Sequence, residues 1–110
     1  MSIEDTIRDQ ISSNPIILYM KGNPNQPQCG FSARVTQILM SCGEKFAYVD
    51  ILSNPDIRSN LPKVSDWPTF PQLFIDGELV GGCDIVSDLH EKGELQEMIA
   101  QSAAKRAEAQ

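Results

Sequence analysis

A cysteine at the predicted start of a helix is the clearest sign of chemistry in this sequence. Cys29 follows a loop of proline and amide residues, 21–28, and precedes a helical pattern. Backbone N–H groups at a helix start lack partners within the helix, and the helix dipole places partial positive charge there. Both effects lower the pKa of a cysteine. The position predicts a reactive thiolate; a small apolar residue near a helix start is the alternative.

Ser32 stands three residues after Cys29, where a C-x-x-C redox pair has its second cysteine. A serine one helical turn along the same face can hydrogen-bond a thiolate, because residues three apart are neighbours on a helix. It cannot form a disulfide with that thiolate. The sequence therefore indicates a one-cysteine version of this arrangement.

The two other cysteines have different surroundings. Cys42 lies on the apolar face of the helix that Cys29 opens, which predicts an inert residue in the core. Cys83 follows two glycines at the start of a later predicted helix. We expect it to contact a ligand through its backbone, and a secondary disulfide through its thiol is the alternative.

Hydrophobic periodicity, with glycine and proline as breaks, predicts the elements that position Cys29. A first amphipathic helix ends at Asn14-Pro15. The apolar run 16–20 predicts a strand buried on both faces. After the loop, a helix that stops at Gly43 has an inward face of Phe31, Val35, Ile38, Leu39 and Cys42.

The rest of the chain adds three strands, two of them in a hairpin, and three helices. Residues 46–49 predict a strand, and Asn54-Pro55 opens a short helix over residues 56–61. Asp76-Gly77 between residues 72–75 and 78–80 is a strong hairpin signal. Then follow a helix with Ile85, Val86 and Leu89 inward, and a last helix from Glu94.

The order of elements predicts the fold. A strand–helix–strand unit implies a parallel pair with a right-handed crossover, and the hairpin adds an antiparallel pair. The simplest solution is an α/β, thioredoxin-like fold with a four-stranded mixed sheet flanked by helices. We expect one domain over residues 1–110, with an ordered core over about 3–103 and a polar C-terminal tail.

Composition excludes several classes of function. The 110 residues include nine basic and fifteen acidic side chains, so the net charge of −6 argues against a nucleic-acid partner. The longest apolar run is far too short to span a membrane. Three sparse cysteines are not typical of a secreted disulfide framework, and the acidic N-terminus is unlike a targeting signal. We expect a cytoplasmic protein.

Four motifs occur in order: Lys21-Gly22, the tetrad 29–32 (Cys-Gly-Phe-Ser), the segment 67–72 (Trp-Pro-Thr-Phe-Pro-Gln) and the segment 81–84 (Gly-Gly-Cys-Asp). Over about residues 4–102 the chain thereby resembles the monothiol, CGFS-type glutaredoxins, in particular single-domain, bacterial-like members. The resemblance implies that Cys29 is both the reactive thiol and an iron–sulfur ligand. It also implies a glutathione site at Lys21, Arg58, Phe70, Cys83 and Asp84.

These residue types suit glutathione. Lys21 and Arg58 can neutralise its glycyl carboxylate, although each could equally be a solvated surface cation. The backbone of Phe70 can pair with the ligand like an added strand, and the resemblance implies a cis bond before Pro71. Asp84 can pair with the α-ammonium, or simply complement the dipole of its own helix.

A [2Fe–2S] cluster needs four ligands, commonly thiolates. With Cys29 as the one usable thiolate, two subunits and two glutathione thiolates complete the set. This predicts a homodimer when the cluster is bound and a monomer without it. The resemblance also points to a heterodimer with a BolA-like protein and to apo iron–sulfur proteins as clients.

The leading hypothesis is therefore an iron–sulfur cluster carrier or scaffold. The alternative is a glutathione-dependent thiol–disulfide oxidoreductase that uses the Cys29 thiolate for deglutathionylation, with at most weak activity because no resolving thiol is present. A third interpretation, a non-catalytic adaptor, makes Cys29 dispensable.

Overall fold

The computed structural model describes residues 2–109, and of residues 105–109 the backbone only. The elements follow in the order α1 (Ile3–Ser13), β1 (Ile16–Met20), β2 (Gly22–Asn23), β3 (Gln26–Pro27), α2 (Gly30–Ser41), β4 (Ala47–Asp50), α3 (Pro55–Ser65), β5 (Gln72–Ile75), β6 (Glu78–Gly81), α4 (Cys83–Glu91) and α5 (Glu94–Ala109).

A mixed four-stranded sheet in the order β4-β1-β5-β6 forms the centre of the molecule. β1 pairs in parallel with β4 and antiparallel with β5, and β5 pairs antiparallel with β6. The thioredoxin-like fold predicted from the order of elements is confirmed. The hairpin turn is also as predicted, with Asp76 and Gly77 both at positive φ, as a two-residue turn requires.

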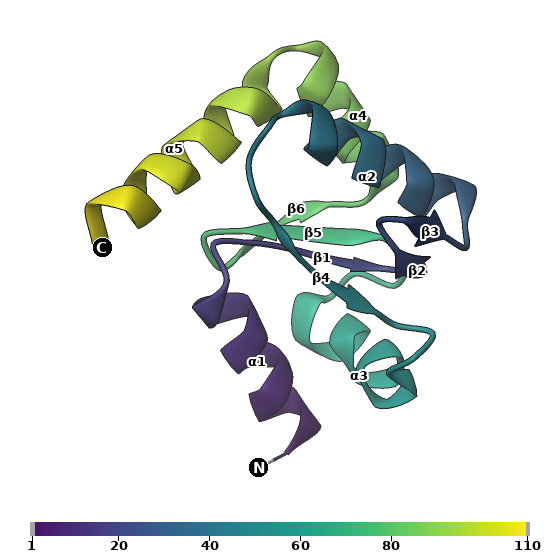
Figure 1. Ribbon diagram of the computed structural model, residues 1–110. Coiled ribbons are helices and arrows are strands. Elements are labelled where there is room, and N and C mark those ends of the chain that lie inside the picture. The colour runs from purple at the N-terminus through teal and green to yellow at the C-terminus, as the bar shows by residue number, and fades with distance from the viewer. Residues whose placement is uncertain (1, 110) are drawn as a thin grey trace.

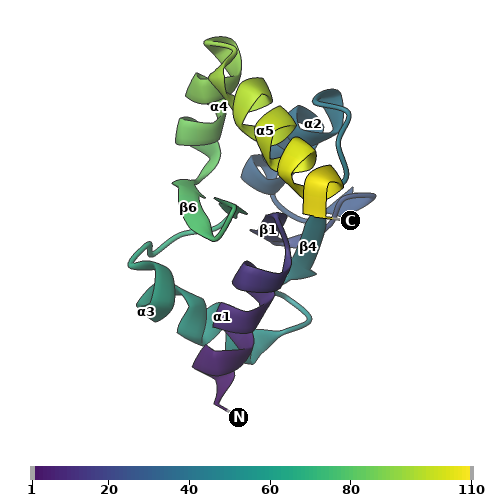
Figure 2. The ribbon, with the colours of Figure 1, turned by 90° about the vertical axis from the view of Figure 1, so that its left-hand side faces the viewer.

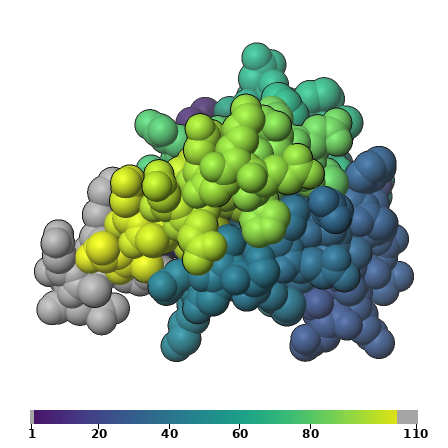
Figure 3. Space-filling view, turned by 90° about the horizontal axis from the view of Figure 1, so that it is seen from above, coloured from purple at the N-terminus to yellow at the C-terminus, as the bar shows by residue number. Residues whose placement is uncertain are grey.

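Helices cover both faces of the sheet. α1 and α3 lie on one face, and α2, α4 and α5 on the other (Figure 1), a layering that the view from the side repeats (Figure 2). Figure 3 shows α2, α4 and α5 side by side across their face. Every residue of β1 is buried, because alternate side chains pack into two separate cores. Ile16, Leu18 and Met20 pack against α2, α4 and α5. Ile17 and Tyr19 pack against α1 and α3.

The segment predicted as a loop before Cys29 contains a small hairpin. β2 and β3 pair antiparallel, with Gly22 opposite Pro27 and Asn23 opposite Gln26. The side-chain oxygen of Asn23 accepts hydrogen bonds from the N–H groups of Asn25 and Gln26, each 2.9 Å long. Such side-chain-to-backbone bonds are how asparagine forms turns, so the segment is ordered by its amide side chains.

Two helices run further than the sequence indicated. α3 continues to Ser65 with Pro62 inside it, although proline removes one hydrogen bond of the helix ladder. Ile57 and Leu61 keep this helix against the core, where both are buried. α5 is helical as far as Ala109, through the polar segment predicted as a tail, and the side chains beyond residue 104 lie outside the described residues.

Replacement of Gly22 by alanine is predicted to destabilise the fold strongly. Gly22 has φ +90°, and a Cβ there would lie 2.5 Å from the backbone oxygen of Gln26. The left-handed conformation costs about 1–2 kcal/mol for other residues, and overpacking adds about 1–3 kcal/mol. We expect Gly22→Ala to lower the free energy of unfolding in urea by about 2–5 kcal/mol.

Gly77→Ala is the matched control. Gly77 has φ +83° but no atom within 4 Å of an added Cβ, so only the conformational cost of about 1–2 kcal/mol applies. Equal losses in the two variants would contradict the crowding assigned to Gly22.

Candidate functional site

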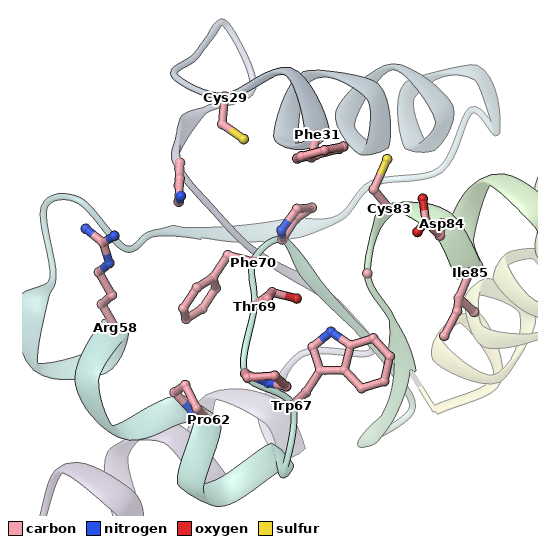
Figure 4. Close-up of a pocket in the computed structure, with 14 residues that line it drawn as sticks. Cys29, Phe31, Arg58, Pro62, Trp67, Thr69, Phe70, Cys83, Asp84 and Ile85 are labelled. Atoms are coloured by element: carbon pink, nitrogen blue, oxygen red, sulfur yellow. The ribbon is translucent and has the colours of Figure 1, made fainter.

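A pocket of about 750 Å³ opens beside Cys29 (Figure 4). Its volume lies within the range of about 300–1,000 Å³ typical of small-molecule sites. The walls come from the loop before α2, from α3, from the segment before β5 and from the start of α4. They consist of Lys21, Cys29, Phe31, Arg58, Pro62, Trp67, Pro68, Thr69, Phe70, Pro71, Gly82, Cys83, Asp84 and Ile85.

Cys29 occupies the N-cap position of α2, with an extended backbone. Its side chain makes no capping hydrogen bond of ordinary geometry, but the pKa of its thiol is lowered. The largest cause is the backbone N–H of Ser32; burial opposes it, and the N–H of Phe31, the charge of Lys21 and the hydroxyl of Ser32 add to the lowering. The predicted thiolate-favouring environment is present.

Ser32 is fully buried, although it lies in the first turn of α2. Its hydroxyl oxygen accepts a hydrogen bond of 3.1 Å from the backbone N–H of Lys21. Its carbonyl oxygen accepts one of 2.8 Å from the hydroxyl of Thr36. Ser32 therefore joins the end of β1 to the start of α2, in addition to its effect on Cys29.

The backbone of Lys21 and Gly22 is held on several sides. The N–H of Gln28 donates to the carbonyl oxygen of Lys21 at 2.9 Å, and the N–H of Gly22 donates to Oδ1 of Asp50 at 3.0 Å. The small hairpin of β2 and β3 thus brings the chain back beside Lys21. As a result, Cys29 and Lys21 line the same pocket.

The opposite wall is the segment from Trp67 to Pro71. The bond between Phe70 and Pro71 is cis, as the family resemblance implied. Buried Gln72 donates through Nε2 to the carbonyl oxygens of Trp67 and Thr69, at 2.8 and 3.1 Å. Among the described residues, Nε1 of Trp67 is buried without a hydrogen-bond partner. The amide side chain of Gln72 therefore holds the segment from Trp67 to Pro71 against the sheet.

The start of α4 forms the third wall. Gly82 is the N-cap residue, and a Cβ there would lie 3.2 Å from the carbonyl oxygen of Pro71, so glycine permits the close approach. Asp84 lies exposed in the first turn, near the positive end of the helix dipole. Sγ of Cys83 lies 4.0 Å from Oγ of Ser87.

All six predicted site residues line this pocket. They are Lys21, Cys29, Arg58, Phe70, Cys83 and Asp84. Arg58 lies on one side, and Cys83 and Asp84 lie on the other (Figure 4). The pocket thus carries positive charge at one end and negative charge at the other. It suits a ligand that has a carboxylate and an ammonium group far apart.

Two predictions of buried residues were wrong. Phe31 and Ile85, both expected in the core, are 60% and 38% exposed and line the pocket. Phe31 lies in the first turn of α2 and Ile85 in the first turn of α4. A side chain so close to the helix start extends beyond the edge of the core, even when helical spacing places it on the core-facing side. Their closeness to Cys29 and to the double glycine was the only signal in the sequence. Trp67 and Pro62 also line the pocket without a prediction of ligand contact.

The three cysteines lie in different surroundings. Cys42 is 8% exposed, and burial raises the pKa of its thiol, which confirms its place in the core. All three are free thiols. Within the described residues, no three His, Cys, Asp or Glu side chains come together as metal ligands. Nor does that part of the chain contain a helix of the length and apolarity that crossing a membrane requires.

Comparison with known proteins gives a consistent result. The sequence pattern of the Glutaredoxin family matches residues 16–80. Glutaredoxin 4 of Escherichia coli is 63% identical over 101 residues, which cover 92% of this chain and 88% of that protein. The solution structure of reduced poplar apo GrxS14 is similar with a TM-score of 0.80 at 45% identity, covering 94% of each chain. The crystal structure of a buckwheat glutaredoxin–glutathione complex has a TM-score of 0.80 at 27% identity and covers 92% and 90%.

The thiol of Cys29 is predicted to titrate below the ordinary cysteine value of about 8.5. The thiolate absorbance of the wild type minus that of Cys29→Ser, followed against pH, measures it. Because the main cause is a backbone N–H and the charge of Lys21 contributes less, Lys21→Ala should raise the pKa only slightly. A titration at or above the ordinary value would contradict the assignment.

The same shift predicts how stability depends on pH. A thiol whose folded pKa lies below its unfolded pKa stabilises the fold fully above the unfolded value, and this contribution is lost as the pH falls through the folded pKa. The stability of the wild type relative to Cys29→Ser should therefore rise with pH through this window and level off above about pH 8.5.

Proposed function

Because this chain belongs to the glutaredoxin family, with a single cysteine in its 29–32 motif, we propose that it binds glutathione and carries a [2Fe–2S] cluster to apo-proteins. The observation that carries the proposal is one accessible, thiolate-favouring cysteine per chain, in a pocket with opposite charges at its two ends.

Glutathione matches the pocket group by group. Its glycyl carboxylate can pair with Lys21 and Arg58, and its α-ammonium with Asp84. The N–H groups at the start of α4 suit the second carboxylate, and the extended backbone at Phe70 suits the ligand's peptide groups. The glutathione complex of the structurally similar buckwheat glutaredoxin supports this ligand.

The residues present also suit an exchangeable iron–sulfur cargo. A [2Fe–2S] cluster takes four ligands, and the described residues provide no group of three that could hold a metal. Cys42 is buried with a raised pKa, and Cys29 lies in the pocket with a lowered pKa, so Cys29 is the thiolate best placed to serve. Two copies of Cys29 and two glutathione thiolates complete the set, and glutathione, being exchangeable, favours transfer over permanent storage.

The rival function, deglutathionylation, is favoured by the lowered pKa of Cys29. The thiolate attacks the glutathione sulfur of a mixed disulfide, which releases the protein thiolate and leaves glutathione bonded to Cys29. A second glutathione thiolate then attacks that disulfide, and oxidised glutathione leaves. Since Ser32 cannot resolve the intermediate, this activity depends entirely on the second glutathione.

The proposal includes the assembly states and the compartment. We propose a homodimer with the cluster bound and a monomer without it, a heterodimer with a BolA-like partner, and apo iron–sulfur proteins as recipients, in the cytoplasm. The exposed side chains of Phe31 and Ile85 in the pocket wall support a contact surface there, because exposed apolar groups near a site are typical of interaction surfaces.

Anaerobic reconstitution with iron, sulfide and glutathione tests the proposal. We expect visible absorption and a dimer mass in the wild type, and neither in Cys29→Ser or without glutathione, because each removes two of the four ligands. Cys42→Ala is the matched control: it removes a buried thiol and should leave the cluster in place. Mass by light scattering and absorption spectra supply the measurements.

Two results would overturn the carrier function. A colourless monomer with rapid deglutathionylation would establish the oxidoreductase, and partner binding unaffected by Cys29→Ser would establish an adaptor. Loss of the cluster in folded Cys42→Ala would show that Cys42 is a ligand.

A further inference from the structure

We propose that Asp50 is a positioning residue that sets the two cations of the pocket, Lys21 and Arg58, at the separation needed to bind one carboxylate together. This inference rests on the proposed binding of glutathione. Asp50 is the last residue of β4 and does not line the pocket. It acts through the two segments that its side chain and backbone join.

The carboxylate of Asp50 bridges two segments far apart in the sequence. Oδ1 accepts hydrogen bonds from the N–H of Gly22 at 3.0 Å and from the N–H of Leu52 at 2.9 Å. Oδ2 accepts one from the hydroxyl of Ser53 at 3.1 Å. A single oxygen atom therefore ties the segment just after Lys21 to the connection between β4 and α3.

The backbone of Asp50 continues this connection to Arg58. Its carbonyl oxygen accepts a hydrogen bond of 2.8 Å from Nδ2 of Asn54, which is the N-cap residue of α3. The carbonyl oxygen of Asn54 accepts one of 3.1 Å from the N–H of Arg58. Hydrogen bonds thus lead from Gly22 through Asp50 and Asn54 to Arg58.

Both cations lie on flexible side chains, so their backbones must be fixed if they are to meet the same carboxylate. On the other side, Ser32 and Gln28 hold the backbone of Lys21. Toward α3, the N–H of Ile51 donates to the carbonyl oxygen of Met20 at 2.9 Å, which joins the two segments through the backbone just before Lys21. Asp50 is the residue whose side chain joins them as well.

The state of the carboxyl group fits this role. Burial raises the pKa of Asp50, but the N–H groups of Leu52, Gly22 and Ser53 and the Ser53 hydroxyl together lower it below its ordinary value. An ionised carboxylate only accepts hydrogen bonds, which is what these donors require.

Four variants separate geometry from charge. Asp50→Ala removes the bridge, Asp50→Asn keeps an oxygen at the same place without the charge, and Asp50→Glu keeps the charge but displaces it. Ser53→Ala is the matched control, since it removes the bond to Oδ2 and leaves the bridge through Oδ1. Titration of each reduced protein with glutathione, followed by NMR, gives the dissociation constant.

We expect Asp50→Ala to weaken glutathione binding about tenfold, or about 1.4 kcal/mol, and Asp50→Glu to weaken it clearly. Asp50→Asn and Ser53→Ala should stay within about twofold, a fraction of that free energy. The pKa of Cys29 should change at most slightly in any variant, because its main cause lies in the first turn of α2 and the charge of Lys21 contributes less. A general loss of structure would move both quantities.

Other outcomes overturn the inference. Unchanged binding in folded Asp50→Ala removes the role, and a loss in Asp50→Asn as large as in Asp50→Ala shows that charge matters rather than position. If Asp50→Ala does not fold, the Asp50→Asn and Asp50→Glu pair still decides between these two. If the wild-type protein does not bind glutathione at all, the proposed function fails, and the inference fails with it. If the wild type and the variants all bind glutathione normally, the inference alone fails.

Discussion

The unpaired N–H groups in the first turn of α2 are the interaction on which this site depends. Helices commonly satisfy such groups with an oxygen from serine, threonine, aspartate or asparagine at the N-cap. Here the N-cap residue is Cys29, and its sulfur makes no capping bond of ordinary geometry. No oxygen therefore supplies the negative charge that these N–H groups favour. They stabilise the Cys29 thiolate instead, chiefly through the N–H of Ser32.

That arrangement works only if α2 is held firmly against the sheet. The buried side chains of Val35, Ile38 and Leu39 pack into the same core as β1, and Ser32 links the first turn to the chain directly after β1. β1 and β4 are parallel, with Met20 opposite Asp50, so their carboxyl ends meet at one edge. In open α/β sheets this edge is where ligands bind, and here Lys21 and Asp50 stand there together.

The sequence predicted the architecture well because several segments carry strong local signals. The apolar run of β1 predicted a buried strand and the Asp76-Gly77 pair predicted a hairpin turn, and both are present. Where the pattern was short it misled: first-turn residues such as Phe31 extend over the pocket edge, which helical spacing alone cannot show. The part played by Asp50 was invisible, because an aspartate after a strand looks like an ordinary turn residue until its partners are known.

The site itself was predicted by two different kinds of reasoning. Physical chemistry located Cys29, while the placement of Arg58 and Phe70 came from the family resemblance, since no local pattern connects residues so distant in the chain. The structure supplies the missing physical reason. The side chain of Asp50 accepts a hydrogen bond from the backbone of Gly22, which is distant in the sequence, and such a long-range contact follows from the completed fold rather than from any stretch of sequence. Gln72 acts locally, on the backbone of Trp67 and Thr69.

The same fold gives the three cysteines different surroundings. The start of α2 lowers the pKa of Cys29, and the end of that helix buries Cys42 and raises its pKa. Cys83 opens another helix, with its sulfur near the hydroxyl of Ser87. At the position where a second redox cysteine would stand, the Ser32 hydroxyl oxygen accepts a hydrogen bond from the backbone of Lys21, and the hydroxyl also favours the Cys29 thiolate. Cys29 is thus the cysteine that combines a place in the pocket with a lowered pKa, and the proposed cluster would take it from two chains together with two glutathione thiolates.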